Sequence, residues 1–164
     1  MEKSATGEEY EHLTHEYEGR YCAVSIIRAG DSMLGEVQAV MPEISVGKIL
    51  IQRDESTADK RPVFYYSKLP PDIASRRVLL VDPMIGTGGS CKAAIECLIK
   101  AGVPEEQIVF INLICCQEGV DAILAAYPKI KLVSAKKDPI LNANKYLVPG
   151  LGDFGDRYFG TVDH

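Results

Sequence analysis

Short apolar runs alternate with amphipathic stretches along most of the chain. Apolar runs, several of them rich in β-branched residues, predict strands at Cys22–Ile27, Val46–Ile51, Val63–Tyr66, Val78–Asp82, Ile108–Ile114 and Lys131–Ser134. Apolar residues recur at helical spacing in Met33–Val40, Ser90–Ala101 and Gly119–Tyr127. Strands that are apolar on both faces and alternate with helices are typical of a parallel sheet covered on both sides. The pattern therefore predicts an α/β fold, with a Rossmann-like parallel sheet and helices on both faces.

The helix predicted at Ser90–Ala101 has the clearest ends. Ser90 is a suitable N-cap, because its hydroxyl can accept a hydrogen bond from a free amide of the first turn. Gly102 suits the position after the last turn, where the backbone often becomes left-handed. Pro42 and Pro128 end the other two helices, since proline cannot continue a helix.

The first residues differ in character from the rest of the chain. Met1–Gly19 is rich in glutamate and contains few apolar side chains, so we expect a solvated tail or one weak arm there. The length of 164 residues suits one domain with a sizeable core. We therefore divide the chain into an acidic tail or arm over residues 1–20 and a folded domain over residues 21–164.

Composition and charge narrow the class of protein. The net charge of −5 argues against binding to nucleic acid or to an anionic membrane. No apolar stretch approaches the ~18 residues of a membrane span. The five cysteines show no CxxC spacing and most lie in apolar surroundings, so we expect reduced, buried thiols in a cytoplasmic protein. The acidic, polar start has none of the features of a secretory leader.

Each unusual loop of the chain follows a predicted strand. These loops are Arg28–Met33, Gln52–Arg61 and Asp82–Ser90. Ligands of parallel α/β sheets bind at the carboxyl ends of the strands, so we expect the site where these loops converge. Gln52–Arg61 is long and polar, and we expect it to be a mobile lid that closes over a bound ligand and excludes water.

The loop Asp82–Ser90 is the most informative, and its sequence is DPMIGTGGS. Glycines allow backbone amides to converge on one point, the following helix adds its N-terminal dipole, and Thr87 and Ser90 add hydroxyls. This combination suits a phosphate group, although the loop matches neither the Walker A nor the GxGxxG pattern. Because Asp82 can accept hydrogen bonds from sugar hydroxyls, the loop predicts a ribose 5-phosphate site. A plain tight turn would use the same residues, and the segment alone leaves that alternative open.

Four segments carry a longer pattern: SIIRAGDSM at Ser25–Met33, IQRDEST at Ile51–Thr57, VDPMIGTGGS at Val81–Ser90 and VPGLGDFGDRYFGT at Val148–Thr161. In these segments the chain resembles the uracil phosphoribosyltransferases, which have the type I phosphoribosyltransferase fold. The resemblance extends from about Cys22 to Thr161, and its last segment is the most specific. Gly86 stands where the family usually has alanine. Family members also carry a longer N-terminal region with an arm that helps them dimerise, so the chain is N-terminally short by comparison.

The resemblance implies transfer of ribose 5-phosphate from phosphoribosyl pyrophosphate (PRPP) to N1 of uracil, with UMP and pyrophosphate as products. It implies catalytic roles for Arg28, Arg53 and Asp153. The two arginines would also bind PRPP, since a guanidinium offers a permanently charged fork to the leaving pyrophosphate. The other PRPP contacts that it implies are Asp82, Pro83, Met84, Ile85, Gly86, Thr87, Gly88, Gly89, Ser90 and Asp153.

The same resemblance implies that uracil lies against Leu147, Gly152, Asp153 and Phe154. A carboxylate near C1 of the ribose, such as that of Asp153, would stabilise the positive charge that develops as the bond to pyrophosphate breaks. Mg²⁺ is the implied cofactor, carried by oxygens of PRPP rather than by protein ligands. A homodimer or a higher homo-oligomer is also implied, together with GTP binding.

Two other functions fit the same residues. One is a non-catalytic regulatory module that binds PRPP or a nucleotide, and the other is a transferase for a different pyrimidine or for a purine. The uracil-type segment Val148–Thr161 disfavours the second. Formation of UMP would separate an enzyme from a regulatory module.

Overall fold

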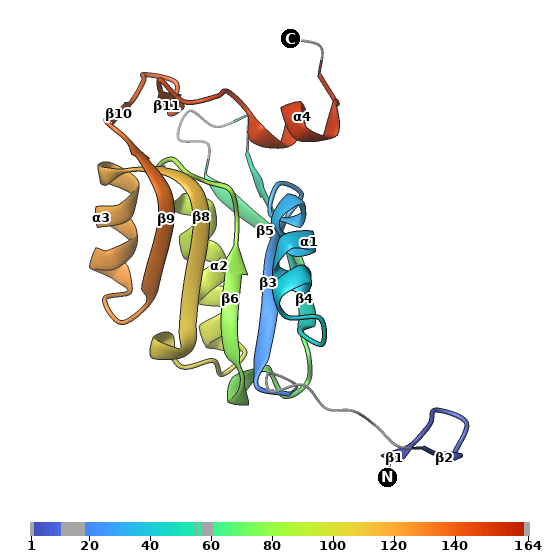
Figure 1. Ribbon diagram of the computed structural model, residues 1–164. Helices are drawn as coiled ribbons and strands as arrows, with labels where there is room; N and C mark the ends of the chain where they lie inside the picture. Colours follow the sequence, from blue (N-terminus) through green and yellow to red (C-terminus); the bar gives the residue numbers. More distant parts are fainter. Residues whose placement is uncertain (1, 11–18, 55, 57–60, 163–164) are drawn as a thin grey trace.

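The computed structural model describes residues 2–10, 19–54, 56 and 61–162 and contains a central seven-stranded sheet (Figure 1). Its strands are β3 (Tyr21–Ile27), β4 (Ser45–Arg53), β5 (Pro62–Lys68), β6 (Arg77–Val81), β7 (Met84–Ile85), β8 (Ile108–Cys116) and β9 (Lys131–Asp138). They lie in the order β5-β4-β3-β6-β8-β7, and β9 also pairs with β8. Every pair is parallel except β4–β5, which is antiparallel.

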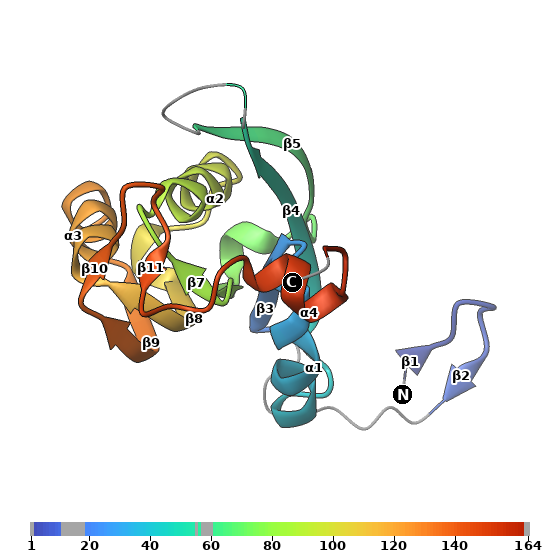
Figure 2. The same ribbon diagram turned by 90° about the horizontal axis from the view of Figure 1, so that it is seen from above.

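Helices cover both faces of this sheet, as Figure 2 shows from above. Helix α1 (Asp31–Val40) packs on one face, where Leu34, Ile44 and Val81 are buried together. Helices α2 (Gly89–Lys100) and α3 (Gln117–Ala126) pack on the other, over a larger core that contains Leu98 and Phe110. The predicted α/β fold with helices on both faces is therefore confirmed.

The direction of β5 was not expected from a parallel sheet. This strand follows β4 as an antiparallel hairpin at the edge of the sheet. Its aromatic residues Phe64, Tyr65 and Tyr66 are at least half exposed. The apolar pattern gave the strand but not its pairing direction, because a short apolar run suits either direction.

The ends of α2 correct one prediction and confirm another. Ser90 is not the N-cap, because the helix begins at Gly89 and its N-cap is Gly88, which has a φ of 79°. A Cβ at Gly88 would also lie 2.9 Å from Ile123 Cγ1, so the chain turns into the helix where only glycine fits. Gly102 does follow the helix in a left-handed conformation, with a φ of 90°. Its amide donates to Ile99 and that of Val103 donates to Leu98, which satisfies the last carbonyls of the helix.

The remaining elements lie at the two ends of the sheet. Short 3₁₀ turns at Ile73–Ser75 and Glu105–Gln107 precede β6 and β8. Strands β1 (Glu2–Lys3) and β2 (Glu9–Tyr10) form a small hairpin that Figure 1 shows apart from the sheet. At the opposite end, the hairpin β10 (Ile140–Leu141) and β11 (Leu147–Val148) leads into helix α4 (Phe154–Phe159). This C-terminal segment crosses above the carboxyl ends of the parallel strands, where the site is expected.

The cysteines agree with the sequence analysis. All five thiols are free, and Cys22, Cys91, Cys115 and Cys116 are buried, whereas Cys97 is half-buried. In the part of the chain that the structure describes, no helix has the length and apolar character needed to cross a membrane.

Candidate active site

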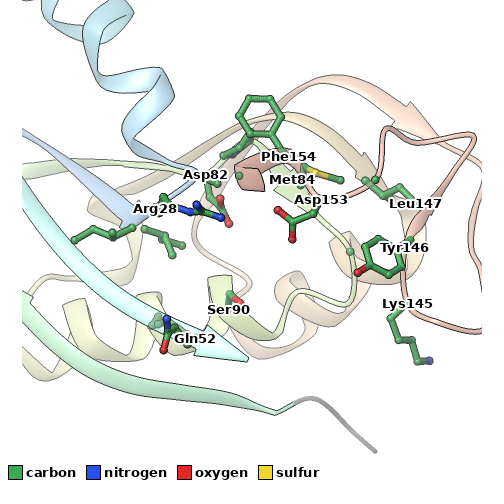
Figure 3. Close-up of a pocket in the computed structure, with 18 of the residues that line it drawn as sticks. Arg28, Gln52, Asp82, Met84, Ser90, Lys145, Tyr146, Leu147, Asp153 and Phe154 are labelled. Carbon is green, nitrogen blue, oxygen red and sulfur yellow. The ribbon is translucent and has the colours of Figure 1, made fainter. Parts of the chain in front are cut away.

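A cleft of about 580 Å³ opens where the end of β4 and the loops after β3 and β6 meet the C-terminal segment (Figure 3). The predicted site residues that line it are Arg28, Asp82, Pro83, Met84, Gly86, Ser90, Leu147, Gly152, Asp153 and Phe154. The predicted convergence at the carboxyl ends of the strands is therefore confirmed for the loops after β3 and β6. Of the predicted loop Gln52–Arg61, only Gln52 lines the cleft among the described residues, and it belongs to β4. Residues that lie more than a hundred positions apart in the sequence meet here, which no single loop could achieve.

The loop of residues 82–90, called the phosphate loop below, contains the short strand β7, which pairs with Ile114 and Cys115 of β8. Beyond β7 the loop borders a second hollow of about 20 Å³. Its lining residues are Asp82, Met84, Ile85, Gly86, Gly88, Gly89, Ser90 and Cys91. Thr87 lies outside both linings. The hollow adjoins the larger cleft, since the two share Asp82, Met84, Gly86 and Ser90.

The amides of this loop are available to a ligand. Within the described part of the chain, those of Gly86, Thr87, Gly88 and Ser90 donate to no protein acceptor. The amide of Gly89 donates only to Oγ1 of Thr87, at the long distance of 3.5 Å. A turn that merely connects two elements would pair most of its buried amides internally. Free amides at the start of α2 are the arrangement by which helices bind phosphate groups.

Helix α3 supports the phosphate loop from behind. Gly119 in its first turn is buried so closely against the loop that a Cβ there would lie 2.1 Å from the Gly86 oxygen. Cys116, the residue that precedes the helix, donates its thiol hydrogen to the same carbonyl across 3.4 Å. These contacts hold the carbonyl of Gly86 on the protein side of the loop.

Arg28 reaches from the end of β3 to helix α4. Its Nη1 donates to Oγ1 of Thr161 at 2.8 Å, and its Nη2 donates to Oδ1 of Asp156. The guanidinium carbon also lies 5.5 Å from the centre of the Phe159 ring, a distance typical of a cation–π contact. Arg28 therefore lies at the cleft, as predicted, with its orientation set by the C-terminal segment.

Asp153 begins α4 and lies at the cleft. Its Oδ1 accepts a hydrogen bond of 2.9 Å from the amide of Asp156, which makes it the N-cap of this helix. The side chain is exposed, and Figure 3 shows it among Arg28, Asp82 and Ser90 around the cleft. One carboxylate thus organises the helix and also faces the space where a ligand would lie.

The backbone around Leu147 is held rigidly. Gly150 has a φ of 56°, and a Cβ on it would lie 2.0 Å from the carbonyl oxygen of Leu147. The amide of Gly150 donates to Oδ2 of the buried Asp138 at 2.9 Å. Leu147 itself is only 4% exposed but contributes to the cleft wall. The cleft therefore has a fixed backbone edge beside Leu147, of the kind that a flat heterocycle requires for hydrogen bonding.

The model of the family described as uracil phosphoribosyltransferase matches residues 2–161. The chain belongs to the uracil phosphoribosyltransferase family. It is 52% identical over 158 residues to the uracil phosphoribosyltransferase of Dictyostelium discoideum, covering 96% of this chain and 71% of that protein. It is 55% identical over 141 residues to uracil phosphoribosyltransferase 2 of Schizosaccharomyces pombe, covering 85% of this chain and 63% of that protein. The chain thus spans about two thirds of the length of these relatives.

Solved structures share the fold of this uracil phosphoribosyltransferase family member. The AQ2163 protein from Aquifex aeolicus matches with a TM-score of 0.82 and 29% identity, over 99% of this chain and 74% of that one. A hypoxanthine phosphoribosyltransferase from Staphylococcus aureus matches with a TM-score of 0.53 and 16% identity, over 77% of this chain and 66% of that one. The second likeness concerns the fold alone, and it agrees with the predicted type I phosphoribosyltransferase fold.

Two further predicted features, Arg53 and the lid, lie at the end of β4 and in the connection from β4 to β5. Arg53 is the last residue of β4, and its backbone pairs with Pro62 of β5. The predicted lid Gln52–Arg61 is shorter than expected, because Gln52 and Arg53 belong to the strand. The predicted mobility concerns residues 55 and 57–60, which lie outside the described residues.

Other residues of this family member line the cleft without having been singled out. Lys145 and Tyr146 lie beside Leu147 in a turn where Oδ1 of Asn142 accepts from the amides of Asn144 and Tyr146, at 2.9 and 3.0 Å. Lys145 holds a left-handed φ of 67° there. The sequence signal that could have identified Lys145 and Tyr146 was their position next to Leu147, a predicted pocket residue. Gln52 and Gly155 also line the cleft, each beside a segment that the sequence analysis had identified.

Burial keeps two thiols protonated, that of Cys91 beside the phosphate loop and that of Cys22 near the start of β3. Desolvation raises the pKa of Cys91 well above its ordinary value, and the nearby charge of Asp82 raises it further. Desolvation likewise raises the pKa of Cys22 to about 11, although the positive charge of Arg76 opposes the change. Both thiols are therefore protonated near neutral pH.

Metal ligands are sparse in the described part of the chain, where no group of three or more His, Cys, Asp or Glu side chains is arranged to hold an ion. The cleft does present two carboxylates, those of Asp82 and Asp153. Mg²⁺ is commonly bound by one or two carboxylates together with substrate phosphates. The donor set therefore fits a magnesium ion that arrives with a phosphorylated substrate.

Proposed function

We propose that the protein transfers ribose 5-phosphate from PRPP to uracil, giving UMP and pyrophosphate. In this reaction a bond forms between N1 of uracil and C1 of the ribose, and N1 releases its proton. The bond from C1 to pyrophosphate breaks, and its electron pair leaves with the pyrophosphate oxygen. The observation that carries the proposal is the row of amides at Gly86–Ser90, which donate to no backbone acceptor among the described residues and lie next to Asp82 at the cleft.

The 5-phosphate would occupy the hollow beside the phosphate loop. Amides at the start of α2 would donate to its oxygens, and the helix dipole would favour its charge. Asp82 lines both the hollow and the cleft, so it is suitably placed to accept hydrogen bonds from the ribose hydroxyls. This arrangement would direct C1 of the ribose into the larger cleft.

Pyrophosphate would leave toward Arg28 and Arg53. Arg28 lies at the cleft with its orientation fixed by Asp156 and Thr161, and a guanidinium can form two parallel hydrogen bonds to a phosphate. When bound, Mg²⁺ would neutralise part of the charge that develops on the leaving pyrophosphate. Asp153 would stabilise the positive charge that develops on the ribose.

Uracil would lie against Leu147 and the segment Gly152–Phe154. The fixed backbone beside Leu147 and the first turn of α4 would supply donors and acceptors for the edge of the base. A site built to match such a pattern rejects bases that leave its groups unpaired. We also propose, from the resemblance alone, that the protein is a homo-oligomer and binds GTP.

An assay with purified protein, PRPP, Mg²⁺ and uracil tests the proposal, with UMP measured by chromatography. We expect UMP and pyrophosphate in equal amounts, and no comparable product from cytosine or hypoxanthine. Asp82→Asn should weaken PRPP use, whereas Asp121→Asn on the exposed side of α3 should match the wild type. Absence of UMP would overturn the proposal. If PRPP nevertheless raised the melting temperature, a regulatory PRPP-binding module would be favoured instead.

A further inference from the structure

We propose that Asp156 is a positioning residue for Arg28. Through Asp156, the orientation of Arg28 at the proposed pyrophosphate position depends on helix α4, which borders the proposed base pocket. This inference rests on the proposed function, because it links the sites proposed for pyrophosphate and for uracil. It predicts that the two ligands bind cooperatively and that Asp156 carries the cooperativity.

The contacts around Arg28 form a closed set. Nη2 of Arg28 donates to Oδ1 of Asp156, and Nη1 donates to Oγ1 of Thr161. The hydroxyl of Thr161 donates in turn to Oδ1 of Asp156, at 2.6 Å. The ring of Phe159 lies against the guanidinium on the same side. A long, flexible side chain is thus fixed by three residues of one short C-terminal segment.

Folding stability is a poor explanation for this set of contacts. The side chain of Arg28 is 41% exposed and that of Asp156 is 29% exposed. Partly exposed ion pairs contribute little to stability, because water screens the charges and the side chains lose rotamer freedom. The main effect of the contact is therefore on where the guanidinium points.

A guanidinium has five N–H donors, and the contacts with Asp156 and Thr161 use two of them. Within the described residues the remaining donors have no protein acceptor, so they can face a ligand in the cleft that Arg28 lines. An arginine that is already fixed loses less conformational freedom when it binds an anion. Asp156 also lowers the local positive charge, and this effect opposes anion binding. Removal of its carboxylate would weaken anion binding through the lost orientation of Arg28, but would strengthen it through the gain in positive charge.

The same helix turn carries the residues proposed to face uracil. Oδ1 of Asp153 accepts from the amide of Asp156 at 2.9 Å, so the cap that starts α4 also fixes the residue that holds Arg28. Nη1 of Arg157 donates to the carbonyl of Leu151 at 2.6 Å and ties the preceding loop to the helix. A base bound against Gly152 and Asp153 would stabilise this turn and, through Asp156, the orientation of Arg28.

Thermodynamic linkage makes the effect reciprocal: if uracil tightens the binding of pyrophosphate, pyrophosphate tightens the binding of uracil by the same factor. Uracil and pyrophosphate do not react with each other under the proposed function, so the pair can be studied at equilibrium. The ligands to use are therefore magnesium pyrophosphate and uracil, titrated by calorimetry into the whole protein.

The experiment measures the dissociation constant of magnesium pyrophosphate with and without saturating uracil. For the wild type we expect uracil to tighten binding by about fivefold or more, the lower end of common coupling factors. Asp156→Ala should reduce that factor to less than about twofold and should weaken pyrophosphate binding about tenfold, the usual size for a lost charged hydrogen bond. Asp156→Glu should restore part of the coupling. Asp121→Ala, an exposed carboxylate on α3, should leave it unchanged.

Circular dichroism and the melting temperature establish that each variant is folded. The inference is overturned if the wild type shows no coupling, if Asp156→Ala keeps the wild-type factor, or if that variant binds pyrophosphate more tightly. Coupling that is lost in Asp156→Ala supports the inference even if the protein forms no UMP, which would overturn the proposed function alone. UMP formation without coupling would overturn the inference alone, and a failure to bind either ligand would overturn both.

Discussion

Gly119 and Gly86 meet where helix α3 touches the phosphate loop, and a Cβ at Gly119 would lie only 2.1 Å from the Gly86 oxygen. The same Cβ would lie 2.7 Å from Cγ2 of Ile85. The Ile85 side chain cannot retreat easily, since Ile85 belongs to β7 and is 1% exposed. The position of the phosphate loop thus depends on the absence of a side chain in a helix that contributes nothing to the cleft lining.

Gly119→Ala should therefore displace the phosphate loop. We expect a loss of about 1–3 kcal/mol in the free energy of unfolding, typical of overpacking. We also expect the KM for PRPP to rise about tenfold, because small displacements of positioning groups are costly. Gly35→Ala is the matched control, since the site lies in α1 with no atom near a Cβ there. It should be neutral or stabilising by up to ~1 kcal/mol, and a wild-type KM in Gly119→Ala would contradict the prediction.

Asp153→Asn should separate the structural role of this residue from its charge. Asparagine caps helices about as well as aspartate, so α4 should persist and the melting temperature should change little. The lost negative charge should lower kcat by about 10²-fold, the scale of a removed transition-state electrostatic contact. The KM for uracil should change much less, and steady-state kinetics measures both constants. A kcat equal to that of the wild type would refute the electrostatic role.

Gly150→Ala should disturb the base pocket in particular. Its Cβ would lie 2.0 Å from the Leu147 oxygen, so the backbone edge beside Leu147 must move. We expect the KM for uracil to rise about tenfold, with the KM for PRPP nearly unchanged. Gly19→Ala controls for left-handed backbone strain, since Gly19 has a φ of 70° and no atom near a Cβ. An equal rise in both KM values in Gly150→Ala would argue against a specific effect on uracil.

Thiol labelling should distinguish the half-buried cysteine from the buried ones. With its pKa raised to about 11, Cys22 is only roughly 0.1% thiolate at pH 8, and burial also blocks access. Cys91 is protected in the same way by its raised pKa. We expect Cys97 to react first with iodoacetamide in the native protein, and all five cysteines to react in guanidinium chloride. Mass spectrometry that found Cys22 or Cys91 labelled as fast as Cys97 would contradict this.

The fold could be predicted from local sequence patterns because the sequence of each element favours the structure that the element adopts. The run at Cys22–Ile27 and the spacing in Ser90–Ala101 correspond to β3 and α2 within one residue at each end. The antiparallel pairing of β5 could not be predicted, since the direction of pairing depends on the partner strand. The N-cap of α2 was misplaced because a serine is the usual cap, whereas here close packing against α3 selects Gly88.

The site could be predicted in part, through the positions of the loops and the resemblance of four segments. The amides of Gly86–Ser90 were predicted to be available because glycines and a helix start adjoin in the sequence. The contact of Arg28 with Asp156 could not be predicted, because it joins residues 128 positions apart through a helix of only six residues. Contacts of this kind depend on how the C-terminal segment crosses the sheet, which no local pattern reports.

A crystal structure with bound UMP would show whether the phosphate loop binds the 5-phosphate. We expect phosphate oxygens about 2.7–3.2 Å from the backbone nitrogens of the 86–90 segment, with the ribose hydroxyls at the carboxylate of Asp82. A phosphate bound elsewhere, with those amides turned toward protein carbonyls, would contradict this expectation.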